Sequence, residues 1–335
     1  MSPRLSRGLG RLVFGLSLAL VALQGPSAGA FGTIIGLGQN AEHERITRVA
    51  LGCSARAPKP CFEPGSMAAL AGHEGSPGAI AIPDITALTL YNPAHCDSGD
   101  YLARPGYPHS AAQARAALSA CRDWMRAHLE AAIRDSGRLV DRQGRLAGSM
   151  DTRDCYRLVL PSHSDKCAVI SDLGIALHVA QDFYAHTNWV DQPDRGAPIS
   201  KTNPPGLGHS GPAPWFSLRG DVAFPPGLIS GCFTAIPESM FCNQAGGGGR
   251  IKHENLEKDE GRIEPTVGLG TTPRGRINGN FARAALAAIA DTRDKWALLR
   301  EGLAARYGAA RARLIVCALV NDDPGRACNA AWNGA

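Results

Sequence analysis

The chain has 335 residues, a length that suits one large domain or two small ones and leaves ample room for a hydrophobic core. Its formal net charge is +5, and three of its 35 Lys and Arg residues but none of its 30 Asp and Glu residues lie in residues 1–30, so the remainder has a net charge near +2. This balance, together with the lack of a basic cluster with interleaved aromatic residues, speaks against a polyanion-binding protein.

Residues 1–30 have the features of a secretory signal peptide. Three arginines precede an apolar run that starts at Leu12, and a stretch of small residues suited to cleavage ends at Ala30. The apolar run is too short for a membrane-spanning helix, and no later run reaches about 18 apolar residues. We therefore expect a secreted protein, extracellular or periplasmic, with no transmembrane anchor. Its mature chain is expected to begin at Phe31, and cleavage after Ala28 is the alternative.

Ten cysteines, all after the expected cleavage site, suit an oxidising compartment. They fall into five close pairs, which we interpret as five local disulfides, although other connectivities remain open. Ligation of zinc by cysteines is the alternative, and the lack of any Cys-x-x-Cys pair disfavours it. The pairs are Cys53 with Cys61, Cys96 with Cys121, Cys155 with Cys167, Cys232 with Cys242, and Cys317 with Cys328.

Helical periodicity dominates the rest of the chain, and alternation convincing enough for strands is absent. We expect an all-α fold, as a single domain over residues 31–335 with no internal repeat. Residues 187–250 are dense in glycine and proline and form a long excursion that we expect to wall one side of a site. Helices are predicted over 41–51, 110–135, 167–186, 278–306 and 309–320, with one or two short ones in 66–90 and a short polar one opening at His253.

The predicted helix over 167–186 carries His178, Asp182 and His186 at spacings of four residues. Side chains at this spacing lie on one face of a helix, so two imidazoles and a carboxylate would form a ridge of metal ligands. Zinc prefers such ligands. The alternative is a buried helix whose polar residues have partners, but three strong ligands in an apolar helix are costly to bury unpaired.

Other strong ligands occur outside this helix. His43 lies in the first predicted helix, Asp84 and His95 are eleven residues apart, and His253 and Glu257 are spaced to share a helix face. With the three residues above they make eight candidate ligands. Eight is too many for one tetrahedral zinc ion and about right for two or three.

The run from Leu173 to Val190, with its His-x3-Asp-x3-His pattern, resembles the zinc-dependent phospholipase C / S1–P1 nuclease superfamily. Within it, the run is similar to the branch that joins fungal heterokaryon-incompatibility (HET-C) proteins to bacterial phosphatidylcholine-hydrolysing phospholipases C. The segment from Asn92 to Asp97 also looks like the bacterial members. The resemblance is specific in 173–190 and covers most of the mature chain only in the order of its ligands.

The resemblance implies the helical zinc phospholipase C-like fold and a division of the ligands among two or three zinc ions. It assigns one zinc to Asp84, His95, His178 and Asp182. A close neighbour would take the main-chain amine and carbonyl of Phe31, His43, and Asp182 as a bridge. A third would take His186, His253 and Glu257. Two departures stand out: the better-known members place the last helix ligand six residues after the Asp, not four, and begin with Trp, not Phe.

By the same resemblance, we expect a phospholipase C that hydrolyses phosphatidylcholine to diacylglycerol and phosphocholine at a membrane surface. Asp84 is the candidate catalytic residue that orients or deprotonates the attacking water. The alternatives are an S1/P1-type single-strand nuclease and a non-catalytic HET-C-like recognition protein. We expect a monomer with no nucleic-acid partner.

Several other polar and aromatic residues have less specific interpretations. Asp97 and Asp100 are either groups behind the ligands or caps of their loop. Phe183, Tyr184 and Trp189 are core or site-wall residues, unless one of them holds a choline by cation–π contact. The remaining histidines have no partner at ligand spacing, so we expect them to lie outside any metal site.

Overall fold

The structure, a computed structural model, describes residues 31–36, 38–54, 60–152, 155, 164–234, 242, 249–263 and 266–332. The predicted signal peptide and His163 lie outside these residues, as does part of the glycine- and proline-rich excursion. Among the described residues the fold is broadly helical, as expected. Its strands form two antiparallel two-residue pairs, β1 (Ile35–Gly36) with β2 (Gln39–Asn40) and β3 (Gly72–His73) with β4 (Ser76–Pro77).

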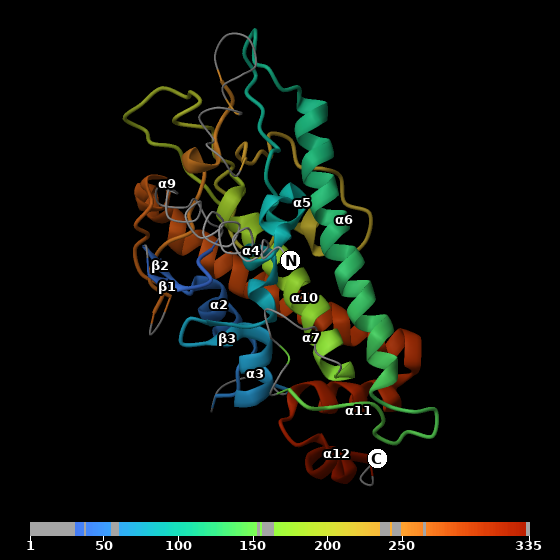
Figure 1. The fold of residues 1–335 in the computed structure, drawn as a ribbon. Coiled ribbons are helices and arrows are strands. Elements are labelled where there is room, and N and C mark those ends of the chain that lie inside the picture. The colour runs from blue at the N-terminus through green and yellow to red at the C-terminus, as the bar shows by residue number, and fades with distance from the viewer. Residues whose placement is uncertain are drawn as a thin grey trace, which may run out of the picture.

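Helix α7 (Asp165–His186) runs through the middle of the molecule, with α6 (Ala111–Asp135) and α10 (Asn280–Tyr307) packed along it (Figure 1). Helix α2 (Glu42–Leu51) packs against α10. Helices α11 (Ala309–Val320) and α12 (Pro324–Trp332) cover the end of the molecule that holds the C-terminus. All these long helices except α12 lie where the periodicity predicted them.

Short elements connect the long helices and carry several candidate ligands. The α-helical ones are α3 (Pro64–Ala71), α4 (Ile82–Ile85), α5 (Asn92–His95) and α9 (Pro273–Arg276). The 3-10 turns are η1 (Ala79–Ala81), η2 (Ala87–Leu90), η3 (Ser136–Arg138), η4 (Pro214–Ser217), η5 (His253–Asn255) and η6 (Ile277–Gly279). The predicted polar helix at His253 is therefore wrong in extent, because only one turn forms there.

Helix α7 is buried on nearly every side, which explains why its sequence is apolar all round rather than amphipathic. Phe183 stacks on Phe216 with ring centroids 4.0 Å apart, and the Tyr184 hydroxyl accepts a hydrogen bond from the Ala213 N–H. Trp189 is 6% exposed and donates from Nε1 to Gly211 O. These three aromatic residues are therefore core or site-wall residues, and their rings are too buried to contact a choline head group.

All five expected cysteine pairs lie at disulfide distance, so the local pairing is confirmed. The Cys96–Cys121 disulfide ties the end of α5 to α6, and the Cys317–Cys328 disulfide ties α11 to α12. Among the described helices, none has the length and apolar character needed to cross a membrane.

Candidate metal centre

Ten ligand-type side chains gather in two adjacent groups around the second half of α7. The first cluster consists of His43, Asp84, His95, His178 and Asp182. The second cluster consists of Asp97, His186, His253, Glu257 and Asp259. In each, sets of three ligand atoms lie within 4.8 Å of one another, a spacing that could hold a metal ion.

Helix α7 divides its three ligands between the two clusters. His178 and Asp182 enter the first cluster, whereas His186, one helical turn further on, enters the second. The predicted common face therefore exists, but it serves two sites. Since an α-helix rises about 1.5 Å per residue, His178 and His186 are separated by about 12 Å along its axis.

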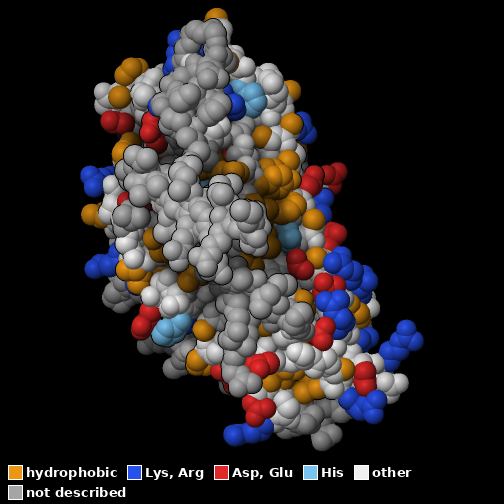
Figure 2. All heavy atoms as spheres, in the orientation of Figure 1, with side chains coloured by type: hydrophobic (Ala, Val, Ile, Leu, Met, Phe, Trp, Pro, Cys, Tyr) orange, Lys and Arg blue, Asp and Glu red, His pale blue; other side chains and the backbone are white. Residues whose placement is uncertain are grey.

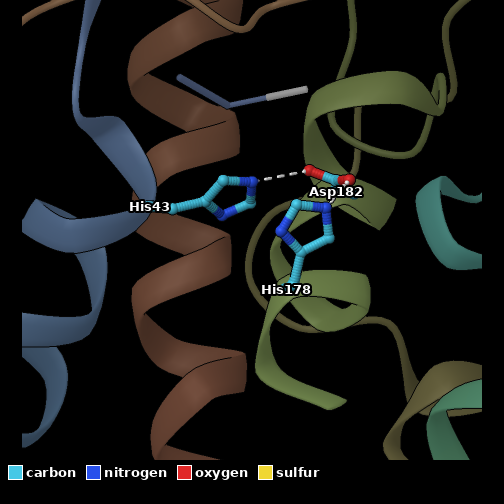
Figure 3. Close-up of side chains that lie close together, drawn as sticks. All are labelled: His43, His178 and Asp182. Atoms are coloured by element: carbon cyan, nitrogen blue, oxygen red, sulfur yellow. Dashed lines mark ion pairs between the residues drawn. The ribbon is translucent and has the colours of Figure 1, made fainter. Parts of the chain in front are cut away.

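The Asp182 carboxylate lies at the middle of the first cluster, between histidines from three elements. Its Oδ1 is 3.1 Å from His43 Nε2, and its Oδ2 is 2.8 Å from His178 Nε2 and 3.0 Å from His95 Nδ1. Figure 3 shows the carboxylate facing the rings of His43 from α2 and His178 from α7. The two oxygens thus point at different sets of histidines, as a carboxylate that bridges two ions would.

The other ring nitrogen of each of these histidines donates a hydrogen bond to an oxygen outside the cluster. A carbonyl oxygen only accepts, so that ring nitrogen carries the hydrogen, and in the neutral imidazole the nitrogen facing Asp182 keeps its lone pair. The pairs are His43 Nδ1 with Gln181 Oε1 at 2.8 Å, His178 Nδ1 with Ile80 O at 2.8 Å, and His95 Nε2 with Leu88 O at 3.3 Å.

A glycine on α7 makes one of these contacts possible. A Cβ on Gly174 would lie 2.6 Å from the Ala79 carbonyl carbon and 2.8 Å from Ile80 N, so a side chain there would push η1 away from the helix. Because Gly174 lets the two backbones approach, Ile80 O reaches His178 one turn further along α7.

Asp84 and Phe31 occupy the outer parts of the first cluster. Asp84 Oδ1 lies 3.7 Å from both His95 Nδ1 and His178 Nε2, and its side chain is 15% exposed, more than the others in this cluster. Asp84 could therefore bind a metal ion together with these histidines and also contact a substrate that arrives from solvent. Phe31 is fully buried, with its ring centroid 5.8 Å from that of His43. The predicted N-terminal residue thus lies beside the cluster.

The charges of the first cluster favour an ionised carboxylate. Burial alone would raise the pKa of Asp182, but His178, His186 and His43 hold that pKa well below its usual range. Burial also lowers the pKa of His178, which favours its neutral form. At His43, burial is outweighed by Asp182, and its pKa is raised. A divalent cation would compete with that proton for the same lone pair.

The second cluster is assembled from α7, the loop after α5, and η5 with the segment that follows it. His186 donates from Nδ1 to His95 O at 2.7 Å, and its Nε2 lies 3.3 Å from Asp259 Oδ1. His253 Nε2 lies 3.8 Å from Asp259 Oδ2 and 3.9 Å from Asp97 Oδ1. His253 Nδ1 lies 3.2 Å from Glu257 Oε2. The predicted trio of His186, His253 and Glu257 is thus brought together, with two further aspartates.

The local backbone explains why acids two residues apart both reach this cluster. The Glu257 N–H donates to His253 O at 2.9 Å, which closes one α-turn. The next residue, Lys258, is fully buried and turns away to pair with Asp191 at 3.0 Å. Glu257 and Asp259, the residues on either side of Lys258, both reach the second cluster.

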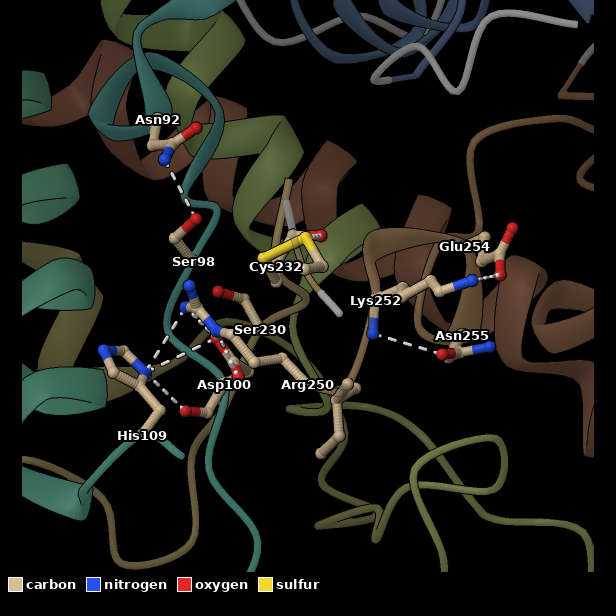
Figure 4. Close-up of a disulfide and its surroundings, with 12 residues drawn as sticks. Asn92, Ser98, Asp100, His109, Ser230, Cys232, Arg250, Lys252, Glu254 and Asn255 are labelled. Atoms are coloured by element: carbon tan, nitrogen blue, oxygen red, sulfur yellow. Dashed lines mark hydrogen bonds and ion pairs between the residues drawn. A yellow bond between two sulfur atoms is a disulfide. The ribbon is translucent and has the colours of Figure 1, made fainter. Parts of the chain in front are cut away.

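A strap formed by residues 230–232 holds the loops of the second cluster together. The His253 N–H donates to Cys232 O at 3.0 Å, and the Ser98 N–H donates to Gly231 O. Gly231 is required here because a Cβ would lie 2.3 Å from His253 Cα. Figure 4 shows the disulfide of Cys232, with Ser98 from the loop after α5 on one side and Lys252, next to His253, on the other.

Asp100 acts as a clamp of its loop rather than as a ligand. Its carboxylate pairs with Arg250 and accepts from the Tyr107 hydroxyl at 2.6 Å, while its carbonyl accepts from His109 Nδ1 (Figure 4). The other described histidines outside the clusters also have partners elsewhere: His128 pairs with Asp172 and His209 stacks on Trp189. His73 is exposed.

Sequence reasoning missed the contribution of two aspartates. Asp97 was expected only as a group behind the ligands or as a loop cap, and Asp259 was not singled out. Each is 2% exposed and reaches the second cluster. Only weak sequence signals mark them. Asp97 follows His95 by two residues, and Asp259 follows Glu257 by two residues in a segment that the spacing predicts to be helical.

The residues of both clusters fit a borderline cation such as zinc. Zinc binds His nitrogen and carboxylate oxygen at about 2.0–2.2 Å, so neighbouring ligands of a tetrahedral ion lie roughly 3.3 Å apart. The facing atoms described above lie 2.8–3.9 Å apart. Among the described residues, several buried atoms in the clusters also have no hydrogen-bond partner, including Asp182 Oδ1, His186 Nε2 and Asp259 Oδ1 and Oδ2. Such atoms are costly to bury without a cation.

Comparison of the chain with protein-family models, with curated proteins and with solved structures gave no match. The superfamily suggested by the 173–190 motif therefore stays a prediction. The two clusters stand on their own geometry, as buried histidine and carboxylate groups that could hold metal ions.

Proposed function

We propose that this protein is a secreted, zinc-dependent phosphoric diester hydrolase of the phospholipase C type. The observation that carries the proposal is the shared Asp182 carboxylate. It faces three histidines whose far nitrogens are all tied to oxygens outside the cluster. This arrangement costs free energy to bury and favours paired ions, which suit displacement at phosphorus.

In this proposal the first cluster holds two zinc ions through Asp84, His95, His178, Asp182, His43 and the main chain of Phe31, and the second holds one. When bound, zinc supplies positive charge for the phosphoryl oxygens and lowers the pKa of water to about 7. Asp84 orients or deprotonates the attacking water, since it is the carboxylate of the first cluster with the most exposure. The tethered histidines keep the lone pairs aimed inward, so little reorganisation accompanies the reaction.

Exposed apolar side chains next to the first cluster favour a lipid substrate. Leu90, the last residue of η2, is 64% exposed, and Tyr91 directly after it is 42% exposed; the Leu88 carbonyl of the same turn holds His95. Ile35 is 55% exposed on β1, in the segment that leads into α2. Figure 2 shows a group of hydrophobic side chains to the upper right of the centre in this view of the molecule. Exposed apolar groups around a site are suited to contact with acyl chains.

The test is a paired assay on the purified mature protein. Phosphocholine release from phosphatidylcholine vesicles and cleavage of single-stranded DNA are followed side by side, with and without a chelator. We expect lipid turnover that chelation abolishes and that Asp182→Ala lowers by at least about 1,000-fold, since it removes the group shared by the ions. Asp172→Ala is the matched control, because Asp172 lies on the same helix but pairs with His128 outside both clusters.

Each result leads to a different conclusion. DNA cleavage without lipid turnover would replace the phospholipase with a nuclease of the S1/P1 type. Bound zinc without turnover of either substrate would favour a non-catalytic recognition protein. Equal losses in Asp182→Ala and Asp172→Ala would show that the variants report on folding, and the role given to Asp182 would be withdrawn.

A further inference from the structure

We infer that the carboxylate ligands of the second cluster are Asp97 and Asp259, and that Glu257 is a positioning residue that orients His253. This inference rests on the proposal that the clusters hold divalent metal ions, and it departs from the ligand set that the sequence resemblance implies. The argument comes from which nitrogen of His253 each carboxylate faces.

The two nitrogens of His253 lie on different edges of the ring and face different carboxylates. Nε2 faces Asp259 Oδ2 at 3.8 Å and Asp97 Oδ1 at 3.9 Å, whereas Nδ1 faces Glu257 Oε2 at 3.2 Å. One imidazole gives a single lone pair to one ion. An ion bound at Nε2 among the two aspartates would leave the hydrogen on Nδ1. Glu257 lies 3.2 Å from Nδ1 without a formed hydrogen bond in this structure, and once aligned it would accept that hydrogen, as a carboxylate behind a ligating histidine does.

His186 supports the same position for the ion. Its Nδ1 donates to His95 O and also lies 3.4 Å from Asp97 Oδ1, so its Nε2 is the nitrogen that remains for a metal. This Nε2 lies 3.3 Å from Asp259 Oδ1, the spacing expected for neighbouring ligands of one tetrahedral ion. Asp259 therefore has one oxygen near each of the two histidines.

Burial separates the aspartates from the glutamate. Asp97 and Asp259 are each 2% exposed, and among the described residues Asp97 Oδ1 and both Asp259 carboxylate oxygens have no hydrogen-bond partner. Glu257 has a 15% exposed side chain. Two buried carboxylates neutralise one divalent ion, so the site can be buried without excess charge. The Glu257 carboxylate is not needed for that balance.

The test measures bound metal rather than activity. The mature protein is loaded with zinc, dialysed, and analysed for metal ions per chain by mass spectrometry, with zinc affinity from a competing chelator. Asp259→Asn and Asp97→Asn should each lose one ion per chain. Glu257→Gln should keep the wild-type number of ions but bind the weakest one about 10- to 100-fold less tightly. Glu260→Gln is the matched control, because it introduces the same amide in the same segment. It should bind the wild-type number of zinc ions with wild-type affinity.

Opposite stoichiometries would overturn the assignment. Loss of one ion from Glu257→Gln, with full occupancy in both aspartate variants, would make Glu257 the ligand. Circular dichroism and occupancy of the first cluster report whether each variant folds, and if Asp259→Asn does not fold, Asp97→Asn and Glu257→Gln still decide. A wild-type protein that binds metal but turns over no lipid would refute only the proposed phospholipase activity. A wild-type protein that binds no divalent metal would refute both proposals.

Discussion

The buried amide of Gln181 offers a sharp test of how the first cluster is held. Gln181 lies on α7 and is fully buried. Its Oε1 accepts from His43 Nδ1 at 2.8 Å, and its Nε2 donates to Thr47 Oγ1 at 2.9 Å and to Thr292 Oγ1 at 3.1 Å. One side chain therefore fixes the tautomer of a ligand and joins α2 to α10 across α7.

Replacing Gln181 by Leu keeps the volume approximately but removes all three hydrogen bonds. Among the described residues, Gln181 Oε1 is the acceptor of the His43 Nδ1–H, so without it this buried donor costs about 1–3 kcal/mol. The two threonine hydroxyls can turn toward carbonyls of their own helices and cost less. We expect the free energy of unfolding of the metal-free protein to fall by about 2–4 kcal/mol, and zinc affinity at the first cluster to fall about 10- to 100-fold.

Urea unfolding of the chelator-treated, disulfide-intact protein measures the stability effect. With a denaturant slope near 3 kcal/mol/M, the expected loss moves the midpoint by about 1 M. Gln143→Leu is the matched control, because Gln143 is exposed in a surface turn and should change stability by less than about 0.5 kcal/mol. A Gln181→Leu midpoint and zinc affinity indistinguishable from those of Gln143→Leu would refute the reasoning.

Two further predictions concern the second cluster and its support. Burial lowers the pKa of His253, but Asp97 and the other nearby acids raise it to about 9. The pKa of His253 in the unfolded chain is near 6.5. The stabilisation from protonated His253 is therefore complete below pH 6.5 and is lost as the pH rises through 9. The urea midpoint of the metal-free protein should fall between these pH values, and a rising midpoint would contradict this. Lys258→Met breaks the buried pair with Asp191, which keeps Arg274 as a partner, and should cost about 1–3 kcal/mol. Lys252→Met, at a partly exposed position, should cost under about 1 kcal/mol. Both are measured by urea unfolding.

The ligands on α7 were predictable because helical geometry alone places them. Periodicity marked the helix, and the four-residue spacing of His178, Asp182 and His186 put them on one face whatever the rest of the chain does. The partition of that face between two clusters was not predictable. It depends on how the segment with Asp84 and the loop with Asp97 pack against α7, and such tertiary contacts leave no periodic pattern in the sequence.

The segment around His253 failed for a different physical reason. A spacing of four residues suggested a helix, yet the chain makes one turn at His253 and is no longer helical at Lys258, whose side chain pairs with Asp191. His253 and Glu257 still meet, since one α-turn is enough for that contact. Asp259 reaches the cluster because the helical turn ends before it. A helix continued from His253 would have placed Asp259 on a different face, so the predicted helix gave no reason to include this residue.

The sharing of Asp182 by His43 and His95 also bears on how the chain folds. These pairs join residues separated by 139 and 87 positions in the sequence. Contacts of such long range close large loops and tend to form late, after local helices have assembled. An unfolded or half-folded chain would hold these ligands apart and bind metal weakly. Tight zinc binding would then report that α2 has docked against α10, which brings His43 to Asp182 on α7.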